Sequence, residues 1–261
     1  MTEFGWIRER IAGLPRVRLA ALPTPLAEAA NLSRALGGPR ILIKRDDLTG
    51  VAFGGNKLRN LEFRLAAALA ERQDTVIVGL DIQSNSARQT VGACNKLGLA
   101  TVLVLEGERP ARVQGNLLVD YLLGADVRFA PTRAAQRAVL DAAAAACRAR
   151  GGRPHILNDN PMFDIASAVA YLETTLEILD QCAALGARPD GLYMSSSGKG
   201  QAGLVLARRL LNAGFTVHGV TATREHDVAA RTAAIAEAAA ERLGLDARFT
   251  PDEIINDAGF V

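Results

Sequence analysis

Short apolar runs alternate with longer stretches of helical periodicity along most of this chain. In the first half, strands are predicted at residues 41–44, 75–78, 101–105 and 127–130. Helices are predicted at residues 57–71, 84–97, 111–123 and 134–149, the first with a leucine face formed by Leu58, Leu61, Leu65 and Leu69. The second half continues with strands at 155–157, 191–194 and 217–220 and helices at 166–185, 201–213 and 227–243.

This strand–helix order predicts an α/β fold in which a parallel sheet is covered by helices on both faces. Ligands of such sheets bind at the carboxyl ends of the strands, where loops lead into helices. The loops after Lys44, Val78 and Met194 are therefore the expected sites.

Composition narrows the classes of partner. The chain has 261 residues, which is enough for two modest α/β domains. Hydrophobic residues make up 49% and charged residues 22%, and the net charge is +2. The sequence has no basic stripe interleaved with aromatic residues, so nucleic-acid binding is not expected. No apolar run has the length of a membrane span, and the first 14 residues carry no apolar signal core, so no membrane partner is expected.

Cysteines and histidines predict no metal site. Cys94, Cys147 and Cys182 lie far apart and form no CxxC pair, which indicates buried free thiols and a cytoplasmic, reducing setting. His155, His218 and His226 match no ligand spacing and are interpreted as structural or solvated residues.

The segment Gly54-Gly55-Asn56-Lys57 lies directly before a predicted helix. Two glycines permit unusual backbone angles and the close approach of a ligand. The helix dipole and any burial would lower the pKa of the lysine amine, which favours its action as a nucleophile. The alternative interpretation is a solvated surface lysine.

Two further loops carry candidate chemistry. Gln83-Ser84-Asn85-Ser86-Ala87-Arg88 follows a strand and offers polar groups for a phenolic oxygen or a carboxylate, although Ser84 is also a plausible helix N-cap. Ser195-Ser196-Ser197-Gly198-Lys199-Gly200-Gln201 joins a strand to a helix, and its small residues predict a phosphate cradle, the alternative being an ordinary turn. Neither the Walker A spacing nor the GxGxxG fingerprint is present. An amine, polar groups for a ring and a phosphate cradle together favour pyridoxal 5'-phosphate (PLP) over NAD or ATP.

Several motifs resemble the D-cysteine desulfhydrase and 1-aminocyclopropane-1-carboxylate (ACC) deaminase family. They are Lys44-Arg45-Asp46-Asp47-Leu48-Thr49, Gly54-Gly55-Asn56-Lys57-Leu58-Arg59, Gln83-Ser84-Asn85 and Gln201-Ala202-Gly203-Leu204. The resemblance runs from about Pro23 to the end of the chain. It implies a tryptophan-synthase-β-like PLP enzyme of fold type II, with two open, parallel-rich sheets and helices on both faces.

The resemblance also implies roles for individual residues. Lys57 would be the Schiff-base lysine and proton shuttle. Asn85 would hydrogen-bond the phenolic oxygen of PLP, and Ser84, with Asn85 and Ser86 beside it, would contact the substrate carboxylate or take part in proton transfer. The phosphate would be held by Ser196, Ser197, Gly198, Lys199 and Gly200.

Some positions depart from the family pattern. The family usually has a second lysine three residues after the Schiff-base lysine, and this position is Asn60 here. We hypothesise that Lys199 replaces the charge of that missing lysine. The segments Gly79–Ile82 and Asn158–Pro161 are usually richer in glycine, and their acidic residues indicate a changed substrate preference. Relatives continue beyond the position of Val261 with a segment that holds the pyridine-nitrogen partner, so a fragment or a degenerate member is expected.

The expected activity is that of a PLP-dependent lyase acting on a small amino acid. Elimination of a sulfur substituent, as in D-cysteine desulfhydrase or a cysteate sulfo-lyase, would give pyruvate and ammonia. ACC-type ring opening and a non-catalytic PLP-binding relative are the alternatives, and a nucleotide-binding α/β protein is disfavoured by the motif order. The resemblance implies a homodimer, with a large domain formed by residues 1–50 and 160–261 and a small domain formed by residues 51–159.

Overall fold

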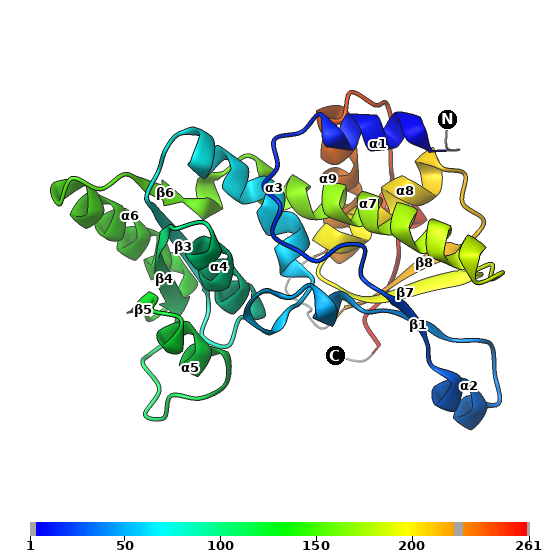
Figure 1. Cartoon of the computed structure of the whole chain (residues 1–261), viewed down its shortest axis with the longest axis horizontal. Coiled ribbons are helices and arrows are strands. Elements are labelled where there is room, and N and C mark those ends of the chain that lie inside the picture. Colours follow the sequence, from blue (N-terminus) through cyan, green and yellow to red (C-terminus); the bar gives the residue numbers. More distant parts are fainter. Residues whose placement is uncertain (1–3, 222–226, 260–261) are drawn as a thin grey trace. The chain divides into compact units, whose positions relative to one another are not determined.

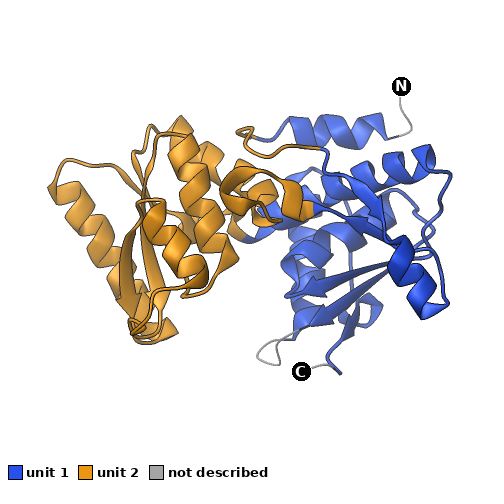
Figure 2. Cartoon of the chain, turned by 60° about the horizontal axis from the view of Figure 1, so that its bottom comes forward, with its two compact units in different colours: residues 1–14, 23–45, 164–261 blue, residues 15–22, 46–163 orange. Residues whose placement is uncertain are grey.

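The computed structural model describes residues 4–221 and 227–259, and the chain forms two compact units (Figure 2). Unit 1 contains residues 1–14, 23–45 and 164–261, and unit 2 contains residues 15–22 and 46–163. Unit 2 thus includes residues 15–22, 46–50 and 160–163, which were predicted to belong to the large domain. That the two units act as the cofactor-binding and the small domain stays a prediction.

Unit 2 is built on a four-stranded parallel sheet with the strand order β5-β4-β3-β6 (Figure 1). Its strands are β3 (Thr75–Asp81), β4 (Ala100–Glu106), β5 (Asp126–Ala130) and β6 (Pro154–Ile156). Its helices are α3 (Lys57–Ala70), α4 (Asn85–Lys96), α5 (Gly115–Leu122) and α6 (Arg133–Ala149).

Both faces of this sheet are covered by helices. Successive side chains of a strand point to opposite faces, so neighbouring strand residues belong to different cores. Val76, Val78, Leu103 and Leu105 join a buried core with residues of α3, α4 and α5. The alternate positions, Ile77, Val102 and Val104, pack against α6 through Leu140, Ala143 and Ala144. The two faces explain why β3 and β4 read as continuous apolar runs rather than alternating ones.

Unit 1 contains a three-stranded parallel sheet and a separate antiparallel pair. The parallel strands are β7 (Gly191–Ser196), β8 (Thr216–Thr221) and β9 (Ile255–Asp257), and the antiparallel pair is β1 (Leu26–Glu28) with β2 (Leu42–Lys44). The helices are α1 (Gly5–Ala12), α2 (Ala30–Leu36), α7 (Met162–Ala184), α8 (Lys199–Leu210) and α9 (Val228–Arg242).

Close helix packing positions the start of α8 in unit 1. A Cβ atom at Gly203 would lie 2.1 Å from the carbonyl oxygen of Ala168, so α7 and α8 meet backbone to backbone at this glycine. The face of the sheet away from α8 carries Tyr193, which is 70% exposed and stacked on His218 with ring centroids 4.5 Å apart.

The predicted helices and strands are present, with ends shifted by a few residues. Three differences are informative. The strand at residues 41–44 pairs antiparallel with β1 instead of joining a parallel sheet, and the strand at 155–157 ends at Ile156, where a short 3-10 helix begins. The short elements α1, β1, α2 and β9 were not predicted, because three to eight residues carry too little periodicity.

Cysteine pairing and helix hydropathy are also defined for the residues that the structure describes. The three cysteines are buried and free, and no group of three metal-binding side chains occurs in this part of the chain. No described helix is both long enough and apolar enough to cross a bilayer. His226 lies outside the described residues.

Candidate active site

Lys57 is the first residue of α3 and is half-buried. Burial is the main cause that lowers the pKa of its amine, and the charge of Arg64, two helical turns further on, lowers it more. A larger fraction of the amine is therefore in the neutral, nucleophilic form than for an exposed lysine.

The segment before Lys57 has an unusual backbone. Ala52, Phe53, Gly54 and Gly55 all have positive φ angles, of 47°, 62°, 70° and 130°. A Cβ atom at Gly54 would lie 1.9 Å from the carbonyl oxygen of Asp47, and one at Gly55 would lie 2.3 Å from the side-chain nitrogen of Gln89. Both glycines are therefore required for the course of this left-handed loop (residues 52–55).

Two buried polar side chains hold the left-handed loop in place. The Thr49 hydroxyl accepts a hydrogen bond from the Gly55 N–H (2.8 Å) and donates one to the Gly55 carbonyl (2.9 Å). Gln89 on α4 accepts from the Leu58 N–H (3.0 Å) through its side-chain oxygen, and its amide nitrogen donates to the Asn85 carbonyl (3.0 Å). Gln89 thus joins the segment of Lys57 to the segment of Asn85 within unit 2.

The second predicted segment forms the start of α4. The Ser84 hydroxyl accepts from the N–H groups of Ser86 (3.2 Å) and Ala87 (3.4 Å), so Ser84 caps the helix as the alternative interpretation expected. Asn85 is exposed and Ser86 is buried. The predicted roles of these three residues toward cofactor and substrate stay predictions.

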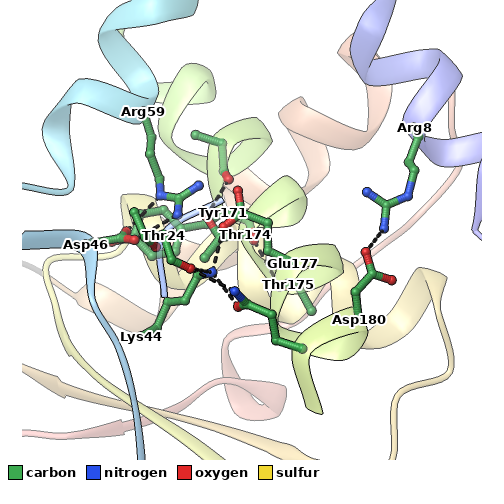
Figure 3. Close-up of polar contacts among 12 residues, drawn as sticks. Arg8, Thr24, Lys44, Asp46, Arg59, Tyr171, Thr174, Thr175, Glu177 and Asp180 are labelled. Carbon is green, nitrogen blue, oxygen red and sulfur yellow. Dashed lines mark hydrogen bonds and ion pairs between the residues drawn. The ribbon is translucent and has the colours of Figure 1, made fainter. Parts of the chain in front are cut away.

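The motif around Lys44 supplies ion pairs (Figure 3). In unit 1, the Lys44 ammonium contacts Glu177 at 2.7 Å and donates to the Thr24 carbonyl at 2.7 Å. In unit 2, the buried Arg59 forms a two-pronged pair with Asp46, at 2.9 and 2.8 Å. Such bidentate pairs fix geometry as well as charge, which gives these motif residues a structural explanation.

The predicted phosphate loop lies in unit 1, between β7 and α8. The Ser196 hydroxyl donates to the side-chain oxygen of Gln201 (2.7 Å) and accepts from the Gly198 N–H (3.0 Å). Ser196 and Gly198 therefore shape the loop by bonding each other, and Gly198 adopts a φ of 100° at the N-cap of α8. Ser197 is exposed, and Lys199 and Gly200 begin the helix.

Charged residues surround this loop. Lys199 pairs with Asp164, and Arg231 lies 3.8 Å from the same carboxylate. A Cβ atom at Gly198 would lie 3.4 Å from the Arg231 side chain, so this arginine packs directly beside the loop. In unit 1, a helix N-terminus with two cations beside it suits a phosphate group. In unit 2, the lowered pKa of Lys57 suits attack on the carbonyl carbon of an aldehyde such as PLP.

Although Thr49 and Arg88 stand within the quoted segments, sequence reasoning assigned no bracing role to the residues that hold these loops. They are Thr49, Arg88, Gln89, Asn116, Asp164 and Arg231. Gln89 had a readable signal, since it lies four residues after Asn85 on a face of α4 that also carries Ala93 and Cys94. The pairs formed by residues that are distant in sequence left no signal in the sequence from which they could be predicted.

Fold and site together define the class of protein, and comparison with known proteins agrees. Residues 17–257 match the family described as pyridoxal-phosphate dependent enzymes, and the chain belongs to this family. The chain is 36% identical over 246 residues to a D-cysteine desulfhydrase of Klebsiella pneumoniae, covering 92% of this chain and 74% of the relative. The predicted family, cofactor class and fold are thereby confirmed.

Solved structures support the same fold. A crystal structure of an ACC deaminase homologue has a TM-score of 0.82 at 30% identity, covering 96% of this chain and 76% of that one. A crystal structure of a threonine deaminase has a TM-score of 0.60 at 24% identity, covering 88% of this chain and 67% of that one, and shows the fold alone. The chain spans about three quarters of the length of the D-cysteine desulfhydrase and of the ACC deaminase homologue.

Proposed function

We propose that this protein is a PLP-dependent lyase that eliminates a sulfur substituent from a small amino acid and releases pyruvate and ammonia. D-cysteine and cysteate are the proposed substrates. The observation that carries the proposal is the half-buried amine of Lys57, with its lowered pKa, at the end of a braced left-handed loop. The identity of 36% to a D-cysteine desulfhydrase supports the substrate class.

The chain's own residues would divide the work as follows. Lys57 would hold the cofactor through its Nζ atom, and the same atom would take the α-proton of the substrate. Ser84, Asn85 and Ser86 orient the substrate and the cofactor ring, and Ser196, Ser197, Gly198, Lys199 and Gly200 bind or shape the site of the phosphate. When bound, PLP supplies the electron sink for removal of the α-proton.

ACC-type ring opening is the second candidate function. It is favoured by the high structural similarity to an ACC deaminase homologue. A non-catalytic PLP-binding protein is the third, and turnover separates it from the other two. We further propose a cytoplasmic homodimer, for which light scattering after size-exclusion chromatography gives the mass in solution.

The first experiment is borohydride reduction of the PLP-loaded chain followed by peptide mass mapping. We expect a phosphopyridoxyl adduct on Lys57, absent from Lys57→Ala and retained in Lys96→Ala, which removes an exposed lysine of the same unit. A folded, PLP-supplied chain without this adduct would contradict the proposal.

Turnover then tests the substrate. Release of pyruvate from D-cysteine, L-cysteine and cysteate is compared with release of 2-oxobutyrate from ACC. Pyruvate from a sulfur amino acid supports the proposed elimination, and keto acid from ACC alone would assign the second candidate. An adduct on Lys57 without any turnover would indicate the non-catalytic alternative.

A further inference from the structure

One carboxylate of α5 is buried and has no hydrogen-bonding partner among the described residues. Asp120 on α5 is 0% exposed, and neither of its carboxylate oxygens has a partner among the described residues. Burial raises the pKa of this carboxyl to about 7, while the charge of Arg88 opposes the increase. Buried acidic groups without partners are rare and costly, so this one calls for an explanation.

Arg88 on α4 is the cation that acts on Asp120, and it binds the left-handed loop. Its guanidinium donates to the carbonyl of Ala52 and to the carbonyl of Gly54 (3.2 Å). It also lies over the ring of Phe53, 6.0 Å from the ring centroid. The guanidinium thus contacts three successive residues that have positive φ angles.

The remaining partner of Arg88 comes from α5. Its Nε atom donates to the side-chain oxygen of Asn116 (2.9 Å), and the Asn116 amide in turn donates to the Gln83 carbonyl (2.8 Å). Asp120 follows Asn116 by four residues and therefore lies on the same face of α5. In this way α5 is linked to both functional segments of unit 2.

The positive charge of Arg88 has no bonded counter-charge among the described residues. All hydrogen-bond acceptors of Arg88 in the described residues are neutral carbonyl or amide oxygens, and no carboxylate there forms an ion pair with it. A half-buried guanidinium is stabilised by a counter-charge across the low-dielectric interior, even where the two groups do not touch.

We propose that Asp120 is a positioning residue for Lys57. Its carboxylate holds the Arg88 guanidinium against the carbonyls of Ala52 and Gly54 and so fixes the loop that presents the lysine. The importance of this position for cofactor capture rests on the proposed function, whereas the effect on the loop itself does not.

Hydrogen exchange of the PLP-free chain at pH 8 tests the effect on the loop. We expect the amides of residues 50–58 to exchange about tenfold faster in Asp120→Asn and in Arg88→Gln than in the wild type. The interior of α6 serves as an internal reference. Asp141→Asn removes an exposed carboxylate of the same unit and is expected to leave the loop unchanged.

The double variant Asp120→Asn with Arg88→Gln distinguishes positioning from a general structural role. If Asp120 acts through Arg88, the loop of the double variant exchanges no faster than that of Arg88→Gln alone. Independent effects would multiply and would overturn the proposal, as would wild-type exchange in Asp120→Asn. Should Asp120→Asn fail to fold, Asp120→Leu replaces it under the same criteria.

PLP capture by the same variants provides the second measurement. Visible absorbance during PLP titration is expected to show affinity reduced about tenfold in Asp120→Asn, with the adduct on Lys57 retained. A wild-type chain without the Lys57 adduct would defeat the proposed function and leave the exchange result standing. An adduct in the wild type with unchanged loop exchange in Asp120→Asn would overturn only the role of Asp120.

Discussion

The loop before Lys57 in unit 2 and the phosphate loop in unit 1 are each held by one fully buried glutamine. In unit 2, Gln89 bonds backbone groups of Leu58 and Asn85 and so joins two functional segments. In unit 1, Gln201 bonds the Ser196 hydroxyl, the Asn256 side chain and the Ile255 carbonyl, and so joins the phosphate loop to the edge strand β9.

The two loops differ in how their charge is handled. The loop before Lys57 is strained and rests on a buried carboxylate, Asp120, through Arg88. The phosphate loop carries its charge at the surface, where Asp164 is 46% exposed beside Lys199 and Arg231. Positioning an amine thus requires desolvated, directional contacts, whereas charge that water can partly screen is sufficient to attract a phosphate.

We expect the largest effect from the buried carboxylate of Asp120, on the pH dependence of the free energy of unfolding. The pKa of Asp120 is raised to about 7, so the folded state binds this proton more tightly than the unfolded chain does. The free energy of unfolding should therefore fall as the pH rises from about 4 to about 7, by up to about 4 kcal/mol from this group. Asp120→Asn should remove this dependence, and denaturant unfolding at pH 5 and pH 8 measures it.

Asp164→Asn, on α7 beside the phosphate loop, is the matched variant. Its exposed carboxylate should contribute little, so its unfolding free energy should follow that of the wild type at both pH values. An Asp120→Asn variant that is no more stable than the wild type at pH 8 would contradict the burial argument.

The strained glycine predicts the next effect. Gly54→Ala would place a methyl group 1.9 Å from a backbone oxygen at φ 70° and ψ −175°, a conformation open essentially only to glycine. We expect a loss of about 3 kcal/mol or more in unfolding free energy, with loss of PLP binding. Gly98→Ala has a similar φ of 72° with nothing within 4 Å, and should cost only about 1 kcal/mol. Equal losses in the two variants would show that the loop can move aside.

Replacing each glutamine by leucine should destabilise the two loops to different extents. Gln89→Leu removes the 3.0 Å acceptor of the Leu58 N–H, which keeps only the 3.4 Å bond to the Gly55 carbonyl, and this backbone donor near a helix start cannot turn away. Gln201→Leu frees mainly side chains, Ser196 and Asn256, which can rotate to other partners. We expect losses of about 2–3 and 1–2 kcal/mol respectively, measured by denaturant unfolding, and the reverse order would contradict this reading.

The smallest effect is expected for the surface cation. Lys199→Ala should weaken PLP binding about threefold to tenfold, because Asp164 already offsets part of the lysine charge. Asp164→Asn should strengthen it slightly for the same reason. Absorbance titration at low and high salt measures both, and unchanged affinity in Lys199→Ala would refute the hypothesis that this residue replaces the charge missing at Asn60.

The sequence was sufficient for the long elements and for the residues inside recognisable motifs. Apolar periodicity located β3, β4, α3 and α4, and glycine spacing pointed to the turn before Lys57. It could not reveal that Ala52 and Phe53 adopt positive φ angles, because residues with a Cβ rarely do so without tertiary support. The pairing of Lys199 with Asp164 and the relation of Asp120 to Arg88 depend on how helices pack, which local patterns do not encode.

The left-handed course of residues 52–55 has a consequence for the order of events in biosynthesis. L-residues resist this handedness by about 1–2 kcal/mol each, so the segment cannot hold its shape before α4 has docked beside it. A nascent or half-folded chain therefore presents Lys57 as an ordinary, protonated surface lysine with little reactivity toward aldehydes. Folding of unit 2 thus lowers the pKa of the Lys57 amine, and the amine becomes reactive only once unit 2 has folded.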